Sequence, residues 1–322
     1  MTLLGRVRRT VFGISFEEAR VERRGFHSSG VLVSTRLERI GTEFLSGYHA
    51  ALEEASCGVL GLRLNETVAA EYRGFAFEGA AMALSLLDYL RFRRRCFREF
   101  LAGPGEPHTY MLHVGVGWAI ARLPWVRRRL DGALNSLDPL LRWLAVDGYG
   151  FHEGYFHSNQ AIRQQAIPRA VTGYTQHAFD QGLGRSLWLV EGMDPERVST
   201  TIAAFPGFRQ ADLWAGAGLA SAYAGGSDWA SLSRLRELSG YQAPACAQGA
   251  AFAAEARRRA GNPVEHCDLA CQSICGMSAE QAAAIARNEM RQLPPDGVIP
   301  AYEIWRRRVQ QRLVKAHDRI PV

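Results

Sequence analysis

Two apolar segments repeat glycine and alanine at the same spacing, and this repeat restricts the fold more than any other feature of the sequence. Gly115-x-Gly117-x-Ala119-x-Ala121 and Gly216-x-Gly218-x-Ala220-x-Ala222 match position for position. Glycine inside a helix costs about 1 kcal/mol relative to alanine, because it loses more conformational freedom on folding. Its repeated use in helix-length segments therefore predicts helices whose backbones pack closely against one another.

A second theme consists of an aromatic residue, small residues about one helical turn later, and a leucine. It occurs at 44–52, 77–84 and 179–187, and the first two copies begin 33 residues apart, near the period of helix-turn-helix repeats. We therefore predict a mostly all-α protein, built as an αα-repeat superhelix or as an irregular helical bundle. The alternative is an α+β fold in which the glycines mark turns between short strands.

Clusters of proline and glycine divide the chain into helix-length intervals, and strand-like alternation is scarce. We expect an N-terminal capping segment over 1–40, a helical core over 41–291, and a C-terminal linker and helix over 292–322. Because both themes recur at similar distances, the core could consist of two duplicated halves, 41–145 and 146–260.

The composition is that of a folded protein and excludes disorder. The chain has 322 residues, of which 47% are hydrophobic and 22% charged, so it can bury a core without disulfide or metal support. Among its 38 Lys+Arg residues there is a single lysine, Lys315, close to the C-terminal end. Schiff-base, pyridoxal-phosphate and P-loop chemistry need a lysine well inside the fold, so these classes lose support.

Charge and hydropathy also bear on partners. A net charge of +6 is mild for this length, and basic runs such as Arg127–Arg129 lie among apolar residues, so nucleic-acid binding is not expected. The longest weakly charged stretches, 113–121 and 213–226, are shorter than the roughly 18 residues of a membrane span. No secretory signal is evident, so we expect a cytoplasmic protein without a transmembrane helix.

The N-terminal segment Met1–Phe12 can form an amphipathic helix. Its leucines and valines oppose its arginines, which suits a helix that caps the core or one that touches a membrane surface. We favour capping.

Three of the six cysteines, Cys267, Cys271 and Cys275, are spaced four residues apart, so on a helix they share one side. A second Cys pair of zinc-ribbon type is missing, and we favour a packing ridge of small residues. The Gly182-x-Gly184 pair lacks the third glycine of a dinucleotide fingerprint. The sequence identifies no cofactor.

The segment 143–157 carries the richest set of reactive side chains. We take Asp147, His152 and Glu153 as candidate acid–base groups, since histidine titrates near neutral pH. A metal site is not expected, because His152 and His157 are five residues apart and diverge by about 140° on a helix; they would converge only if the segment turns. The competing interpretation is an aromatic-rich helix junction. Candidate substrate-binding residues in this segment are Tyr149, Tyr155 and His157.

Further candidates are scattered along the chain. His108 follows a rigid turn and could line a pocket mouth. Asp180 and Arg185 are predicted to pair with neighbouring helices rather than with each other. Asp212 and Glu78 hold comparable places in the repeat themes and read as salt-bridge partners of arginine. Trp214 would help to shape a pocket.

Five segments, in order, resemble the bacterial domain-of-unknown-function family numbered 1702: Tyr72–Met82, Gly103–His108, Trp143–Phe151, Phe179–Trp188 and Ala211–Leu219. The resemblance extends from about Leu4 to Ala286. That family includes UnbL-type proteins associated with enediyne polyketide biosynthesis, and it has no agreed reaction or catalytic residue set. The resemblance implies an actinobacterial accessory protein that acts around a polyketide-derived polyene or enediyne core.

Two functional hypotheses follow from these observations. In the first, the protein is an enzyme that promotes cyclisation, isomerisation or another proton transfer on a hydrophobic polyene or polyketide. In the second, it is a non-catalytic helical scaffold or carrier that binds the intermediate or other pathway proteins. Contact with a membrane surface through Met1–Phe12 is a third interpretation.

Overall fold

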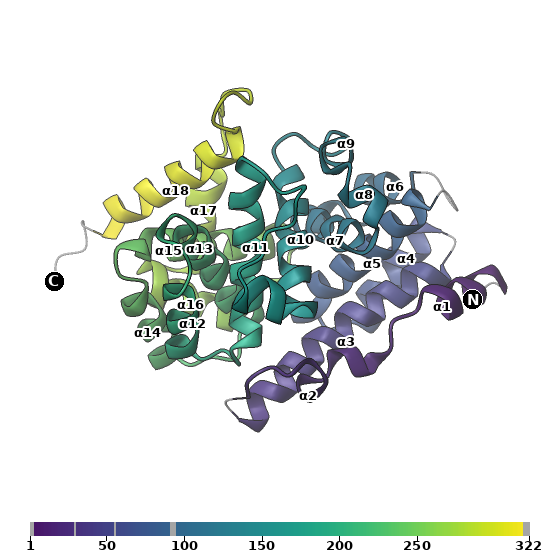
Figure 1. The fold of residues 1–322 in the computed structure, drawn as a ribbon, viewed down its shortest axis with the longest axis horizontal. Coiled ribbons are helices and arrows are strands. Elements are labelled where there is room, and N and C mark those ends of the chain that lie inside the picture. The colour runs from purple at the N-terminus through teal and green to yellow at the C-terminus, as the bar shows by residue number, and fades with distance from the viewer. Residues whose placement is uncertain (1–2, 29, 55, 91–94, 318–322) are drawn as a thin grey trace.

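The computed structural model describes residues 3–28, 30–54, 56–90 and 95–317, and every regular element in those ranges is a helix (Figure 1). The prediction of a mostly all-α protein is confirmed, and the α+β alternative is wrong. The α-helices are α1 (Leu3–Phe12), α2 (Val21–Arg24), α3 (Val31–Glu53), α4 (Cys57–Thr67), α5 (Arg73–Tyr89), α6 (Cys96–Ala102), α7 (Thr109–Arg122), α8 (Pro124–Arg127), α9 (Leu130–Leu134), α10 (Arg142–Phe156), α11 (Tyr174–Val190), α12 (Pro195–Ala203), α13 (Gly207–Ala224), α14 (Trp229–Ser239), α15 (Ala243–Arg259), α16 (Glu265–Cys275), α17 (Ala279–Glu289) and α18 (Ala301–His317). Short turns of helix lie at Phe16–Ala19 (η1), Ala70–Tyr72 (η2), Glu106–His108 (η3), Asn159–Arg163 (η4) and Gly240–Gln242 (η5).

Seven of these helices form a row in which each packs on the next, in the order α3, α5, α7, α10, α11, α13 and α15. Glycines lie at the crossings. Gly117 of α7 faces the backbone oxygen of Ala145 in α10, and Gly148 of α10 faces that of Val114 in α7. A Cβ at either glycine would lie 2.1 or 2.0 Å from the opposing oxygen, so only glycine permits this approach.

The G-x-G spacing follows from the row. Residues two apart on a helix point about 200° apart, so one glycine serves each neighbour. On α11, Gly182 packs against the backbone of Asp147 in α10, and Gly184 packs against that of Leu213 in α13. The prediction of closely packed helix backbones is confirmed.

The row curls, so that α13 and the end of α15 reach the start of α5 and the turn η2 before it. Arg257 of α15 donates a hydrogen bond to the backbone oxygen of Glu71 at 3.2 Å, and Asn262 donates one to Ala70 at 3.0 Å. Gly74 of α5 packs against the Tyr223 hydroxyl of α13. The helices therefore enclose a central space. The predicted boundary between two halves, at 145, falls inside α10, and their duplication stays a prediction.

The N-terminal segment covers one side of this space, although not as the sequence suggested. The amphipathic helix forms as α1, from Leu3 onward, while residues 1 and 2 lie outside the described ranges. It packs through Gly5 against the backbone of Glu53. Its apolar residues, Leu3, Leu4, Val7 and Val11, are exposed. Residues 14–19, which follow α1, contact the central space instead.

The cysteine ridge lies on α16, where Cys267, Cys271 and Cys275 are all buried. The Cys271 and Cys275 thiols face backbone oxygens of α15 at 3.8 and 3.4 Å. The interpretation as a packing ridge is confirmed. Across the described ranges, none of the helices combines the length and the apolar character that a bilayer crossing requires.

Candidate functional site

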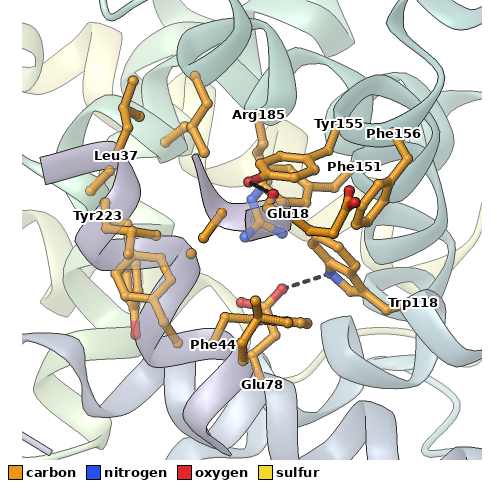
Figure 2. Close-up of a pocket in the computed structure, with 18 of the residues that line it drawn as sticks. Glu18, Leu37, Phe44, Glu78, Trp118, Phe151, Tyr155, Phe156, Arg185 and Tyr223 are labelled. Atoms are coloured by element: carbon orange, nitrogen blue, oxygen red, sulfur yellow. Dashed lines mark hydrogen bonds between the residues drawn. The ribbon is translucent and has the colours of Figure 1, made fainter. Parts of the chain in front are cut away.

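A cavity lies at the centre of the curled row, between α3, α5, α7, α10, α11, α13 and the segment 14–19 (Figure 2). Its volume is about 60 Å³, which is room for a few water molecules or a slender chain, since one water needs about 10–15 Å³ on this measure. The walls are mostly aromatic and aliphatic, with rings from Phe44, Phe75, Phe151 and Phe156. Such a lining suits a hydrophobic ligand.

Glu78 places a carboxyl group in this apolar cavity. It lies in the middle of α5 and is 2% exposed. The Trp118 indole donates a hydrogen bond to Glu78 Oε1 at 2.9 Å, which the dashed line in Figure 2 marks. Burial raises the pKa of Glu78 to about 7, although the positive charge of Arg185 opposes the rise. Glu78 can therefore exchange a proton near neutral pH.

Arg185 enters the same cavity from α11, opposite Glu78 (Figure 2). Its guanidinium forms a buried ion pair with Asp147 of α10 and lies 5.0 Å from the centre of the Phe151 ring. Gln181 donates a hydrogen bond to the other Asp147 oxygen at 2.8 Å. Burial alone would lower the pKa of Arg185, but Asp147 and Glu78 raise it overall, so the guanidinium stays charged.

The charge balance explains which carboxyl group takes the proton. Two carboxyl groups, Asp147 and Glu78, act on one buried cation. Asp147 pairs with it directly, whereas Glu78 forms no ion pair within 4 Å in the described part of the chain and bonds to neutral Trp118. A second buried negative charge would be uncompensated, so Glu78 is the group that protonates.

Two buried donors at this site lack a hydrogen-bond partner among the described residues: Arg185 Nε and the Tyr223 hydroxyl. Leaving such a group unpaired costs about 1–3 kcal/mol, and native proteins rarely do so without a reason. An acceptor oxygen on a bound molecule would satisfy either donor.

A second chamber of about 40 Å³ lies beside the first, on the side of α15 and α18. It shares Arg185, Leu219 and Tyr223 with the first, and Phe252 and Trp305 add aromatic surface. Arg185 therefore lies between two apolar chambers, and an elongated ligand that filled both would pass its guanidinium.

The sequence-predicted candidates fall into three places, and the first is this cavity. Arg185 lines both chambers and Asp147 lines the second, and their pairing across α10 and α11 agrees with the prediction that Arg185 bonds to a neighbouring helix. Tyr155 lines the wall and donates its hydroxyl hydrogen to the backbone oxygen of Glu18 at 3.3 Å.

The second place is a cluster at the end of α10, formed by His152, Glu153 and His157. The Nδ1 atoms of both histidines lie 3.1 Å from oxygens of the Glu153 carboxylate. Burial lowers the pKa of His152. For Glu153, burial would raise the pKa, but the hydrogen bond from His152 and the nearby positive charges lower it overall. Of the three candidate acid–base groups, the structure thus separates His152 and Glu153 from Asp147.

The two histidines meet because the helix stops. The 140° divergence holds only for a continuous helix, whereas α10 ends at Phe156 and His157 adopts φ −127° and ψ 40°. The ring centres of His152 and His157 are 5.7 Å apart. His152 also packs edge-on against Trp118, with ring centres 5.6 Å apart, so the cluster lies behind the cavity wall.

The remaining candidates lie in the packed interior and line neither chamber. Asp180 pairs with Arg209 of α13, so it bonds to a neighbouring helix as predicted. Asp212 pairs with Arg306 at 2.7 Å, which agrees with its prediction as a salt-bridge partner of arginine. The others, His108, Tyr149 and Trp214, are buried among helices, where His108 stacks on Phe77 and Tyr149 meets Phe179 edge-on.

The prediction that Glu78 is a salt-bridge partner of arginine is wrong, because Arg185 pairs with Asp147 and Glu78 bonds to Trp118 instead. Sequence reasoning also missed Trp118 and Tyr223 at the cavity. A signal did exist for Glu78, because it is the one charged residue in the apolar run 74–87. A carboxylate in such a run must be paired or protonated.

Comparisons with known proteins give one result. A family model described as "Protein of unknown function (DUF1702)" matches residues 3–313. Comparisons with curated proteins and with solved structures give no match.

Proposed function

The chain belongs to the DUF1702 family, and from that premise we propose that it binds a hydrophobic, chain-like small molecule in its central cavity and transfers a proton on it through Glu78. The observation that carries the proposal is the state of Glu78: a buried carboxyl group whose pKa is raised to about 7 inside an apolar, aromatic cavity. An acid–base group works best when its pKa lies near the working pH.

The ligand that fits best is a polyketide-derived polyene with a carbonyl group. A conjugated chain is slender and apolar, which suits two small aromatic chambers that share Arg185, Leu219 and Tyr223 as lining residues. A carbonyl oxygen would accept hydrogen bonds from the unpaired Arg185 Nε or Tyr223 hydroxyl. The resemblance to UnbL-type proteins supports the same class, as an intermediate of enediyne or polyketide biosynthesis.

The proposed reaction is an isomerisation by proton transfer. The Glu78 carboxylate removes a proton from a saturated carbon attached to the conjugated chain, and the electron pair of that C–H bond delocalises through the chain onto the carbonyl oxygen near Arg185. Protonated Glu78 then returns the proton at another carbon, so the double bonds shift without any co-reactant. Cyclisation is a further outcome when the shifted chain can fold on itself.

Neighbouring residues have separate tasks in this proposal. Asp147 holds the Arg185 guanidinium in place through their ion pair, and it is a positioning residue. Trp118 orients the Glu78 carboxyl group through its indole N–H. The aromatic walls exclude water from the anionic intermediate.

A non-catalytic carrier is the alternative, since the apolar chambers alone would shield a reactive polyene. In that case the protein would hand the intermediate to other pathway proteins, and Glu78 would serve only to orient Trp118.

The two functions differ in a spectroscopic experiment. Purified protein is mixed with a linear conjugated polyene that carries a terminal carbonyl, and its absorption is followed over time. Wild type is compared with Glu78→Gln and with Glu106→Gln, a control on an exposed carboxylate.

If the protein is an enzyme, the spectrum should change progressively with wild type and with Glu106→Gln. With Glu78→Gln it should show only a stable stoichiometric shift. A stable stoichiometric shift with all three proteins identifies a carrier. If no protein shifts the spectrum, the cavity does not bind this ligand class.

A further inference from the structure

We propose that His152, Glu153 and His157 form a binding site for a divalent transition-metal ion, with zinc as the reference ion. One ligand atom from each residue can be chosen so that all three lie within 4.8 Å of one another. In the described part of the chain, this is the one group of three or more His, Cys, Asp and Glu residues found with such spacing. The inference does not depend on the function proposed for Glu78.

The spacing of the ligand atoms fits zinc. With Zn–N and Zn–O bonds of about 2.1 Å in a tetrahedral site, neighbouring ligand atoms lie roughly 3.4 Å apart. Here each imidazole Nδ1 lies 3.1 Å from a Glu153 oxygen. The two contacts use different oxygens of Glu153, and the three ligand atoms lie within 4.8 Å of one another, so side-chain movements of up to about 1.4 Å would bring them to the separations of a tetrahedral site.

The donor set has the composition of an open site. Two imidazoles and one carboxylate are three protein ligands, and a water molecule would complete the coordination. The His152 and Glu153 side chains are largely buried, whereas the His157 side chain is 45% exposed. An ion can thus reach the cluster from solvent on the His157 side.

Metal binding requires both imidazoles to change tautomer, but it releases no proton from the cluster. Without metal, each Nδ1–H can donate a hydrogen bond to Glu153, so the cluster is satisfied when empty. With metal, each Nδ1 lone pair faces the ion and the ring proton moves to Nε2. Arg122 and Arg127 add positive charge nearby, so we expect moderate affinity rather than that of a closed four-ligand site.

A bound ion would fix the side chains at the end of α10, which lie next to the wall of the cavity. His152 packs against Trp118 and Phe156, which both line the first chamber. Fixing the imidazole would hold Trp118, and with it the hydrogen bond to Glu78, in one orientation.

The test uses the full chain after treatment with a chelator. Zinc binding is measured by calorimetry, and cobalt is added separately for its visible absorption. The variants are Glu153→Gln, His157→Ala and His157→Cys, with His27→Ala as control, because His27 is a half-exposed histidine 3.8 Å from a Glu191 carboxylate oxygen outside the cluster.

We expect one equivalent of zinc in wild type and in His27→Ala, and at least a tenfold loss of affinity in Glu153→Gln and His157→Ala. His157→Cys should restore binding and add a sulfur-to-cobalt charge-transfer band, which places the ion at residue 157. The proposal is overturned if wild type binds no zinc, or if Glu153→Gln and His157→Ala leave zinc binding unchanged.

Discussion

Asp147 and Arg185 form an ion pair inside the protein, with side chains 1% and 6% exposed. The pair uses the one guanidinium that also faces Glu78 (Figure 2). Glu78 is consequently left with a neutral hydrogen-bond donor, Trp118, and with a pKa raised to about 7. The proposed acid–base chemistry depends on this arrangement, in which Arg185 is the counter-ion of Asp147 and leaves Glu78 without one.

Replacing Glu78 should change how stability depends on pH. The pKa of Glu78 rises from 4.5 to about 7 on folding, which corresponds to about 3 kcal/mol, since a tenfold change in an acid constant is worth about 1.4 kcal/mol. Wild type has this contribution in full below pH 4.5 and loses it as pH rises through 7. Glutamine does not ionise. The free energy of unfolding of Glu78→Gln should therefore rise by about 3 kcal/mol relative to that of wild type as the pH increases from 4.5 to 8.

Denaturant unfolding of both proteins across this pH range measures the difference, and groups that titrate alike in both cancel. A difference between the two proteins that stays constant with pH would show that Glu78 keeps its ordinary pKa.

Removing the partner of Arg185 should be costly. Asp147→Asn leaves a buried guanidinium without its counter-ion, and breaking such a pair typically costs about 3–5 kcal/mol. The exposed Asp131 on α9 provides the control, where Asp131→Asn should stay within about 0.5 kcal/mol. Equilibrium unfolding in urea measures both. Equal, small effects of the two substitutions would mean that Asp147 is not the counter-ion of Arg185.

The glycine crossings should tolerate no Cβ. In Gly148→Ala the new methyl group would lie 2.0 Å from the Val114 backbone oxygen, so α7 and α10 must separate, at a cost of about 3 kcal/mol or more. Gly132 of α9 has no atom within 4 Å of its Cβ position, and Gly132→Ala should stabilise by about 0.5–1 kcal/mol. Thermal unfolding distinguishes the two. A neutral Gly148→Ala would contradict the close packing.

Turnover of the polyene should depend on pH through Glu78. The carboxylate is the proposed base, and its pKa of about 7 means that the active form increases as pH rises. We expect kcat/KM to rise about tenfold per pH unit below pH 6 and to level off above pH 8. Glu106→Gln should keep this profile. A profile that falls over the same range would make the protonated form the active one and assign Glu78 the role of an acid.

The sequence was sufficient to predict the helix packing, because the requirement for glycine is local. The G-x-G pairs of α7, α11 and α13 indicate that each of these helices packs against the backbone of a neighbouring helix on both sides. The pairing of Asp180 and Asp212 with arginines of other helices was also predictable, since buried carboxylates need counter-ions.

The site could be predicted only in part. Asp147 and His152 are near neighbours in sequence, but five residues along α10 turn them to different sides of the helix. The environment of Glu78 depends on α5, α7 and α11 together, which no short motif records. The meeting of His152 with His157 depends on where α10 ends, and helix ends are the least predictable feature of a sequence.

The most direct test of the central claim is exchange of substrate hydrogen with solvent. Wild type, Glu78→Gln and Glu106→Gln are incubated with the carbonyl-bearing polyene in D₂O, and deuterium in the recovered polyene and its products is measured by mass spectrometry. The account predicts deuterium incorporation with wild type and Glu106→Gln, and none above the protein-free rate with Glu78→Gln. Equal incorporation by Glu78→Gln, or none by wild type although the polyene binds, would contradict proton transfer by Glu78.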